Sequence, residues 1–439
     1  MSSVLLCGFS LTGTAEDLVT VAEELLRRGH RVTMLAGEAA RPAFGALDVR
    51  FVAVREGALP QSGVLRSPFM QRVNDVFEDV RTVYLEPAAD QWRVLQRVLV
   101  QEQVDVVITD GLFFGASALA YLPHDARPAV IDLGMFPLSV PAAGVPPYGF
   151  GIPPIDSLGA RVQAFLLKAA AAAPYLRLSR AFGTMVEQLT GVAPRGDIRT
   201  ATSVADAWLQ LTVERFEYPR ASMPENVRFI GALRPPASGP PPAWWDPSST
   251  RPVVAVLNDT SADVADLVLP SLRAFADDDV DIVVSGAGRA EVEARSGGPL
   301  GPSVRFERTM PWEYLRRDRT VVLSTGDYVH TQYALRRGIP VVAAGTLGHQ
   351  VETAARIAWS GLGIDLRTRR PDPLAVRQAV LRIREDGSIL AALARVASQF
   401  ATHDAEAALA DVVDEIAARA RGGLGRPADG SAEALRSAR

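Results

Sequence analysis

The stretch "VVLSTGDYVHTQYALRRGIPVVAAG", from Val321 to Gly345, decides the fold class. Its two apolar runs, 321–323 and 339–344, are predicted strands, and a helix is predicted between them, from near Val329 to Gly338. Strand, turn, helix and strand in this order form a parallel crossover unit. The start of such a helix often binds phosphate, because its free backbone N–H groups and its dipole both favour an anion.

The start of this predicted helix holds a carboxylate and three bulky side chains, at Asp327, Tyr328, Val329 and His330. Two like charges about 4 Å apart repel each other by roughly 4 kcal/mol at an effective dielectric constant near 20. A repulsion of that size corresponds to an affinity for a diphosphate that is lower by about three powers of ten. The repulsion is absent if Asp327 points away or caps the helix, and a protonated His330 would offset it. These alternatives stay open at the level of sequence.

The bulk composition is that of a globular protein of two or three domains. The chain has 439 residues, 48% hydrophobic and 22% charged, with a formal net charge of −4. Acidic and basic residues are interspersed, so neither nucleic acid nor an anionic membrane is an expected partner. The single cysteine, Cys7, excludes an intramolecular disulfide and a cysteine-based zinc site, and we expect no metal. No apolar run approaches the roughly 18 residues of a membrane span and no signal-type segment opens the chain, so we expect a cytoplasmic protein.

Strands and helices alternate in the first half of the chain, which predicts an open, doubly wound α/β sheet. The predicted elements are strand 3–9, helix 15–30, strands 31–37 and 49–54, helix 83–103, strand 104–110, a short helix 116–122 and strand 128–134. The stretch 136–158 is dense in Pro and Gly but too apolar for a plain linker. We interpret it as a binding loop over the strand ends, with Phe136, Pro147, Tyr148 and Phe150 as ligand contacts.

A segment rich in Pro and Ser, residues 234–252, is the clearest boundary in the sequence. After it the strand–helix pattern restarts, with a predicted helix over 262–277 and a last helix over about 404–421. Two α/β halves in tandem imply a cleft in which the strand ends of both halves face a ligand.

Several stretches are similar to family 1 glycosyltransferases of GT-B architecture, specifically the bacterial macrolide-type natural-product branch. They include "FEYPRASMPENVRFIGALRPP", "PPAWWDPSSTRPVVAV", "LRAFADDDVDIVV" and "AARIAWSGLGIDLRT". The resemblance covers residues 1 to about 415 and implies two Rossmann-like domains facing across a cleft. It implies the following division: an acceptor-binding domain 1–233, the linker 234–252, a nucleotide-sugar-type domain 253–403, and a helix 404–421 packing back on the first domain. The tail 422–439, rich in Gly, Ala and Arg, is expected to be disordered.

The resemblance places a donor diphosphate at the helix start described above, where this chain departs from the family motif. Thr325 stands at a position that is His or Asn in the family, and Gly326 is retained. Asp327 replaces a second Gly, and His330 replaces a small residue.

Further donor-site residues follow from the same resemblance. His349 stands where the family often has an acidic residue that holds sugar hydroxyls, and the neighbouring Gln350 is kept. Thr260 is kept in an earlier turn in which Asp259 replaces the family's Gly. Met310 and Trp312 match a base-binding turn, in which Trp312 either stacks on a flat ring or fills the core.

The resemblance also implies a catalytic His in the loop after the first strand, supported by an Asp. Thr14 stands at the position of that His, and the Asp is present as Asp110. Thr14 cannot act as a base at neutral pH, and capping of the first helix is its alternative role. A transferase would therefore need another base, for which Glu16, Asp17 or an ionised acceptor are candidates.

Two functions are consistent with this combination of residues. The first is transfer of a sugar from a nucleotide sugar, as co-substrate and without another cofactor, to an apolar polyketide- or peptide-like molecule. The alternative is a repurposed homologue that binds the small molecule without a nucleotide sugar, for other acid–base chemistry or as an auxiliary protein. We favour the first, because the similarity extends over most of the chain.

Overall fold

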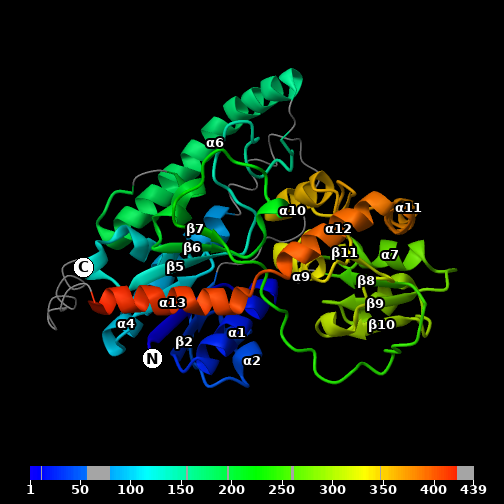
Figure 1. The fold of residues 1–439 in the computed structure, drawn as a ribbon, viewed down its shortest axis with the longest axis horizontal. Coiled ribbons are helices and arrows are strands. Elements are labelled where there is room, and N and C mark those ends of the chain that lie inside the picture. The colour runs from blue at the N-terminus through cyan, green and yellow to red at the C-terminus, as the bar shows by residue number, and fades with distance from the viewer. Residues whose placement is uncertain are drawn as a thin grey trace.

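The computed structural model describes residues 1–10, 12–56, 80–154, 157–194, 197–258, 262–346 and 348–422. Two parallel sheets lie side by side (Figure 1). The first has the strand order β3-β2-β1-β4-β5-β6-β7. Its strands are Ser3–Cys7 (β1), Arg31–Ala36 (β2), Arg50–Ala53 (β3), Val106–Thr109 (β4), Ala129–Gly134 (β5), Ala207–Gln210 (β6) and Val227–Phe229 (β7).

Alternating side chains of the first sheet pack into two apolar layers, as the two-residue period of a strand requires. Val4 and Leu6 of β1 face one layer, and Leu5 and Cys7 face the other. The helices of this half are Thr12–Arg27 (α1), Arg41–Phe44 (α2), Ala88–Gln101 (α4), Phe114–Ser117 (α5) and Leu158–Thr190 (α6). Short turns of helix lie at Glu38–Ala40 (η1), Val80–Leu85 (η2, a π-helix), Ala118–Tyr121 (η3), His124–Ala126 (η4), Ile198–Val204 (η5) and Glu214–Phe216 (η6).

The second sheet has the strand order β10-β9-β8-β11-β12-β13 and is also parallel. Its strands are Val253–Leu257 (β8), Asp281–Ser285 (β9), Val304–Glu307 (β10), Thr320–Ser324 (β11), Val341–Ala343 (β12) and Gly363–Asp365 (β13). Its helices are Val268–Ala274 (α7), Arg289–Ser296 (α8), Trp312–Tyr314 (η7), Tyr328–Arg336 (α9), Gly348–Trp359 (α10), Pro373–Glu385 (α11) and Gly387–Phe400 (α12).

The last helix, Ala405–Gly422 (α13), returns to the first sheet, where it contacts α1, β4 and β5 (Figure 1). Residues 230–252, between β7 and β8, contain neither helix nor strand. The domain boundary within 234–252 remains our proposal. The tail after Gly422, expected to be disordered, lies outside the described residues.

Two predicted helices are shorter than expected. The helix predicted over 83–103 is divided at Pro87, which cannot donate a backbone hydrogen bond, into η2 and α4. The helix predicted over 262–277 is limited to α7, because Asp263 and Asp266 bind backbone amides in a turn before it.

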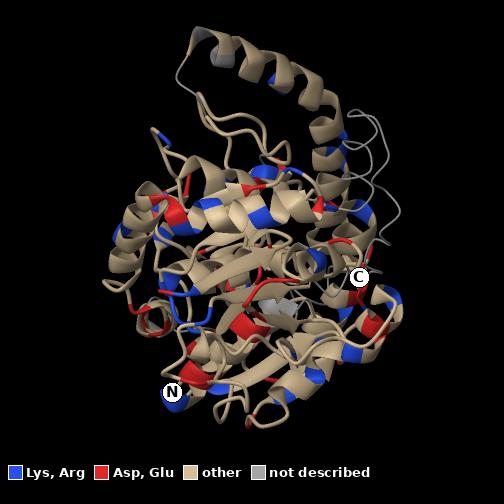
Figure 2. Cartoon of the chain, turned by 90° about the vertical axis from the view of Figure 1, so that its right-hand side faces the viewer, with Lys and Arg blue, Asp and Glu red and all other residues tan. Residues whose placement is uncertain are grey.

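Charges are mixed along the ribbon, with Lys and Arg interspersed among Asp and Glu (Figure 2). None of the helices in the described part of the chain is both long and apolar enough to cross a bilayer.

Candidate functional site

The turn between β11 and α9 packs tightly on the start of α10. Gly326 has a φ of 91°, and a Cβ atom there would lie 2.8 Å from the carbonyl oxygen of Gln350. A Cβ on Gly345 would clash with the carbonyl oxygen of Thr325 and with the Gln350 side chain. The structure therefore brings together three predicted donor-site residues: Thr325, Gly326 and Gln350.

Asp327 caps α9, which answers the question that the sequence left open. Its Oδ1 accepts a hydrogen bond from the His330 amide at 2.8 Å and lies 3.1 Å from Nδ1 of the same residue. Burial opposes ionisation, but the His330 side chain and amide hold the pKa of Asp327 at about 2. The carboxylate is therefore ionised, with its charge directed toward His330.

His330 joins the two halves of the molecule. Its Nε2 lies 3.2 Å from Oε2 of Glu16, which belongs to the second turn of α1. Burial acts to lower the pKa of His330, but the Asp327 and Glu16 carboxylates raise it well above its usual value. His330 is therefore an imidazolium held between two carboxylates, with the Trp312 ring stacked on it at a centroid distance of 6.2 Å.

A second contact between the same helices is fully buried. The Tyr333 hydroxyl donates to Oδ1 of Asp17 at 2.7 Å, and Asp17 is only 2% exposed. Burial raises the pKa of Asp17 to about 8, although the hydrogen bond from Tyr333 acts in the opposite direction. Asp17 is thus engaged in the contact between the halves.

Thr14 and Asp110 are both buried. Thr14 is buried inside the first turn of α1, which begins at Thr12, so the expectation that Thr14 caps this helix is wrong. Asp110 accepts hydrogen bonds from the amides of Phe9, Leu112 and Phe113 at 2.8–3.1 Å. Burial raises the pKa of Asp110 to about 6, against the lowering effect of these amides.

The remaining donor-site candidates differ in their surroundings. Met310 and Trp312 are buried, at 4% and 2% exposure, and belong to the apolar core. Thr260 lies outside the described residues. His349 lies at the start of α10, where its ring contacts the ring of Phe136 from the first half at 4.9 Å.

The predicted acceptor loop is fixed to its surroundings at several points. Pro147 is buried, and Tyr148 and Phe150 are half-buried. The Tyr148 carbonyl accepts a hydrogen bond from the Tyr175 hydroxyl of α6. The amides of Gly149 and Gly151 both donate to Oε1 of Glu352 in α10, at 2.8 and 3.0 Å.

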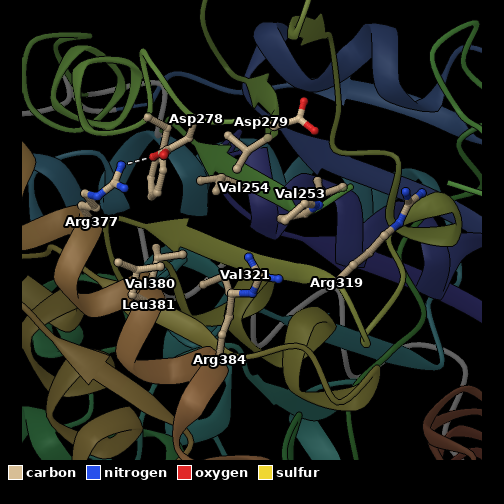
Figure 3. A pocket seen from close by; sticks show the side chains of 13 residues that line it. Val253, Val254, Asp278, Asp279, Arg319, Val321, Arg377, Val380, Leu381 and Arg384 are labelled. Atoms are coloured by element: carbon tan, nitrogen blue, oxygen red, sulfur yellow. Dashed lines mark hydrogen bonds and ion pairs between the residues drawn. The ribbon is translucent and has the colours of Figure 1, made fainter. Parts of the chain in front are cut away.

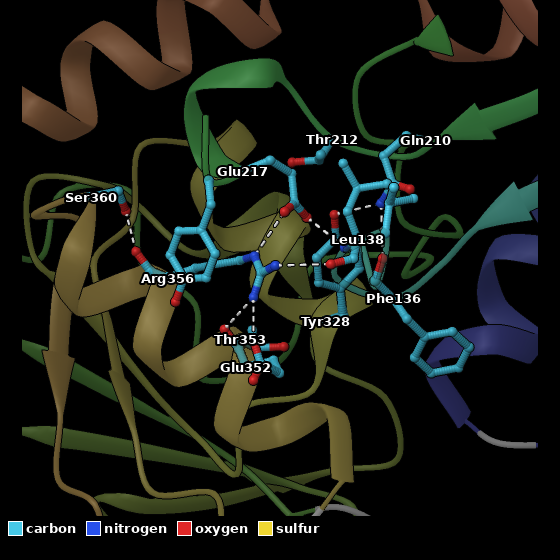
Figure 4. A network of polar contacts seen from close by, with 12 residues as sticks. Phe136, Leu138, Gln210, Thr212, Glu217, Tyr328, Glu352, Thr353, Arg356 and Ser360 are labelled. Carbon is cyan, nitrogen blue, oxygen red and sulfur yellow. Dashed lines mark hydrogen bonds and ion pairs between the residues drawn. The ribbon is translucent and has the colours of Figure 1, made fainter. Parts of the chain in front are cut away.

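A buried ion-pair network behind this loop was not predicted from the sequence (Figure 4). Arg356 lies between Glu217 and Glu352, with 2.8 Å from its Nε to Glu217 and 2.8 Å from its Nη1 to Glu352. The four-residue spacing of Glu352 and Arg356 in the sequence was the available signal for half of the network. Glu217 is distant in sequence, and only the fold brings it near.

The described residues contain no cluster of His, Cys, Asp and Glu suited to a metal ion. A hollow of about 190 Å³ lies at the opposite, amino-terminal edge of the second sheet, where Asp278 and Arg377 form an ion pair (Figure 3). It is lined by β8 and β11 at the strand starts, away from the turns described above. We therefore place the candidate site at the carboxyl ends of the strands.

Comparison with solved structures identifies the fold class. The chain superposes on the calicheamicin glycosyltransferase CalG4 with a TM-score of 0.66 and 18% identity, covering 95% of this chain and 99% of that one. The glycosyltransferase VinC, solved in complex with dTDP, gives 0.65 and 19%, covering 96% and 100%. The two sheets thus have the GT-B fold.

Comparison of sequences then gives the family. No protein-family model matches the chain. It is 31% identical to the 4'-demethylrebeccamycin synthase of Lentzea aerocolonigenes over 92% of this chain and 96% of that protein. It is 29% identical to UDP-glycosyltransferase 2 of Phaeomoniella chlamydospora over 94% and 96%. The chain therefore belongs to the natural-product glycosyltransferases, whose reaction is sugar transfer from a nucleotide sugar, and a repurposed homologue is not favoured.

Proposed function

We propose that the protein transfers a sugar from a uridine or thymidine diphosphate sugar to an apolar natural product bound under the loop 136–154. The observation that carries this proposal is the pairing of Asp327 with the His330 imidazolium. This pairing offsets the negative charge that would otherwise oppose a diphosphate at the start of α9. The first-turn amides of α9 that have no partner within the helix would then bind the phosphate oxygens.

The proposed donor position places the sugar near α10. His349 and Gln350 lie in the first turn of this helix, next to Gly326, and would contact the sugar hydroxyls. Phe136 touches His349 from the acceptor loop, so an acceptor under that loop would meet the sugar there. The bond between the anomeric carbon and the diphosphate oxygen breaks, and its electron pair stays on that oxygen. A bond forms between the anomeric carbon and an oxygen or nitrogen of the acceptor.

Glu16 is the proposed acceptor of the proton released in this step. The Glu16 side chain is 15% exposed and contacts His330 of α9. Asp17, in contrast, is enclosed by its contact with Tyr333. Thr14 offers no basic group, and Asp110 is occupied by three amides. Glu16 therefore takes the role that the family assigns to a His.

Calorimetric titration with UDP and with TDP tests the donor site. We expect one of them to bind with a dissociation constant in the micromolar range, about −8 kcal/mol. Absence of binding at millimolar nucleotide would contradict the proposal and favour a protein that binds small molecules without a nucleotide sugar.

The variant Glu16→Gln tests the base. We expect the rate of sugar transfer, or of donor hydrolysis when water is the acceptor, to fall by about 10²–10⁴, while nucleotide affinity is retained or increased because a negative charge beside His330 is removed. Glu23→Gln, on the same helix and 38% exposed, is the matched control and should leave both values unchanged. Equal rates for the two variants would exclude Glu16 as the base.

A further inference from the structure

Two amides of the acceptor loop bind the same carboxylate on one helix of the opposite half. Both loop amides, of Gly149 and Gly151, bind Oε1 of Glu352, while Oε2 of the same group pairs with Arg356. Gly151 has a φ of 60°, and a Cβ atom there would lie 2.9 Å from the carbonyl oxygen of Val351. The loop backbone therefore touches α10 so closely that a small shift of the helix must move the loop.

The start of the loop is attached to the same ion pairs. The Leu138 carbonyl accepts from Nη2 of Arg356 at 3.2 Å, and the Leu138 amide donates to Oε1 of Glu217 at 3.0 Å (Figure 4). A second guanidinium, that of Arg220, donates to the same carbonyl at 2.9 Å. Both ends of the loop thus terminate on the network of Glu217, Arg220, Glu352 and Arg356.

These charged groups depend on one another because they are buried. Glu217, Glu352 and Arg356 are 4%, 3% and 1% exposed. A buried charge is costly unless it is paired and hydrogen-bonded. With Arg220 the network holds two positive and two negative groups, so its formal charge is zero. Its carboxylates are fully satisfied only when the loop lies in place.

The same helix carries the proposed sugar contacts. His349 and Gln350 precede Glu352 by less than one helical turn, and Gln350 packs on the Gly326 turn of the donor site. A rigid helix therefore connects the donor turn at its start to the acceptor loop one turn later.

We propose that Glu352 and Arg356 are positioning residues that fix the acceptor loop on α10, so that donor binding at the β11–α9 turn, on which Gln350 of α10 packs, and order of the acceptor loop are coupled. The coupling rests on the proposed function, whereas the positioning of the loop does not. The network selects the closed loop over open arrangements, and the loop in turn determines which acceptors reach the sugar.

Hydrogen–deuterium exchange of the free protein tests the positioning. In Glu352→Ala, we expect exchange of the 145–154 segment to accelerate by at least about tenfold, because both loop amides lose their acceptor. Glu352→Gln should give an intermediate effect, since the amide oxygen still accepts but Arg356 loses one of its two carboxylate partners. Glu291→Gln, on the exposed face of α8, is the control.

Circular dichroism establishes that each variant is folded, and Arg356→Lys provides a second, milder disruption. Unchanged loop exchange in folded Glu352→Ala and Arg356→Lys would overturn the proposal.

Adding UDP or TDP to the same samples tests the coupling. In the wild-type protein, the nucleotide that binds should slow exchange of the 145–154 segment further, and in Glu352→Gln this additional protection should be lost while the dissociation constant of the nucleotide stays within about threefold. Binding that leaves loop exchange unchanged in the wild type would overturn the coupling. If neither nucleotide binds, the proposed function fails, while exchange in the free protein still decides the positioning.

Discussion

At the scale of single residues, Asp327 and His330 must be considered together. Asp327 caps α9 and pairs with His330, and His330 also pairs with Glu16 across the molecule. Neither side chain alone determines the charge at the start of the helix. The effect of either substitution therefore depends on whether the other residue is present.

The variants Asp327→Asn, His330→Ala and their combination test this pairing. His330→Ala should weaken nucleotide binding by at least about tenfold, or roughly 1.4 kcal/mol, because two carboxylates lose their cation. Asp327→Asn retains an effective cap and should change affinity by less than about tenfold. Adding Asp327→Asn to His330→Ala should restore most of the loss. A tightening of about 100-fold or more from Asp327→Asn alone would show that the carboxylate faces the nucleotide.

Asp17 gives the protein a specific pH dependence. Its pKa is about 8 in the folded state, above the unperturbed value of roughly 3.9, so the folded state retains a proton that the unfolded state releases. The stability of the folded protein therefore falls as pH rises from about 4 to about 8. Asp17→Asn keeps an acceptor for Tyr333 and removes this titration. We expect its melting temperature to exceed that of the wild type increasingly as pH rises through this window. Parallel melting profiles from pH 4.5 to 8.5 would contradict the prediction.

At the scale of elements, the β11–α9 turn depends on the absence of a side chain at Gly326. Gly326→Ala should lower the melting temperature and weaken nucleotide binding, because a non-Gly residue with this φ costs about 1–3 kcal/mol and its Cβ meets Gln350. Gly288→Ala is the matched control: Gly288 precedes α8 after β9, has a φ of −85°, and has open space for a Cβ. Equal melting temperatures for the two variants would remove the special role of the Gly326 turn.

Sequence periodicity predicted several elements whose apolar residues recur at the expected spacing, but others were missed, including the amphipathic helices α11 and α12. The strands around β11 and the helices α1 and α9 were predicted, because their apolar residues recur at the expected spacing. Helices α8, α11 and α12 and strand β13 were not assigned. β13 has only three residues, and α8 contains a single buried apolar residue, Val292. The stability of such elements comes from tertiary packing, which a local pattern does not record.

Site residues could be predicted from the sequence only where a motif and a position in the chain are enough to identify them. The sequence identified Asp327 and His330 as unusual residues, and left the cap as one of two alternatives. It could not pair His330 with Glu16, or Asp17 with Tyr333, because more than 300 residues separate the partners. These contacts exist only because two helix starts, α1 and α9, face each other. The assignment of individual residues to donor and acceptor remains a proposal.

At the scale of the whole molecule, the two sheets share one apolar cluster and several polar contacts. The cluster extends from Val4 and Leu6 of the first sheet to Val253 and Val322 of the second. The buried charges of Glu217, Glu352 and Arg356 lie at the same junction. Apolar burial stabilises the junction, whereas the ion pairs specify one arrangement of the loop, since buried ion pairs contribute little net stability.

Arg356 contributes both to the stability of the fold and to the arrangement of the loop. Arg356→Ala leaves two carboxylates buried without their shared partner, at a cost of about 3–5 kcal/mol. With an unfolding entropy of about 2.1 cal/mol/K per residue, this should lower the melting temperature by roughly 3–5 °C. The exposed Arg308→Ala is the control and should not change it. The double variant Arg356→Met, Glu352→Gln removes one positive and one negative charge, keeps Glu217 paired with Arg220, and should recover most of the lost stability by calorimetry. Its acceptor loop should nevertheless stay as exchange-labile as in Glu352→Gln, because the ionic contacts that fix the loop are gone. Recovery of loop protection together with stability in this double variant would show that packing alone positions the loop.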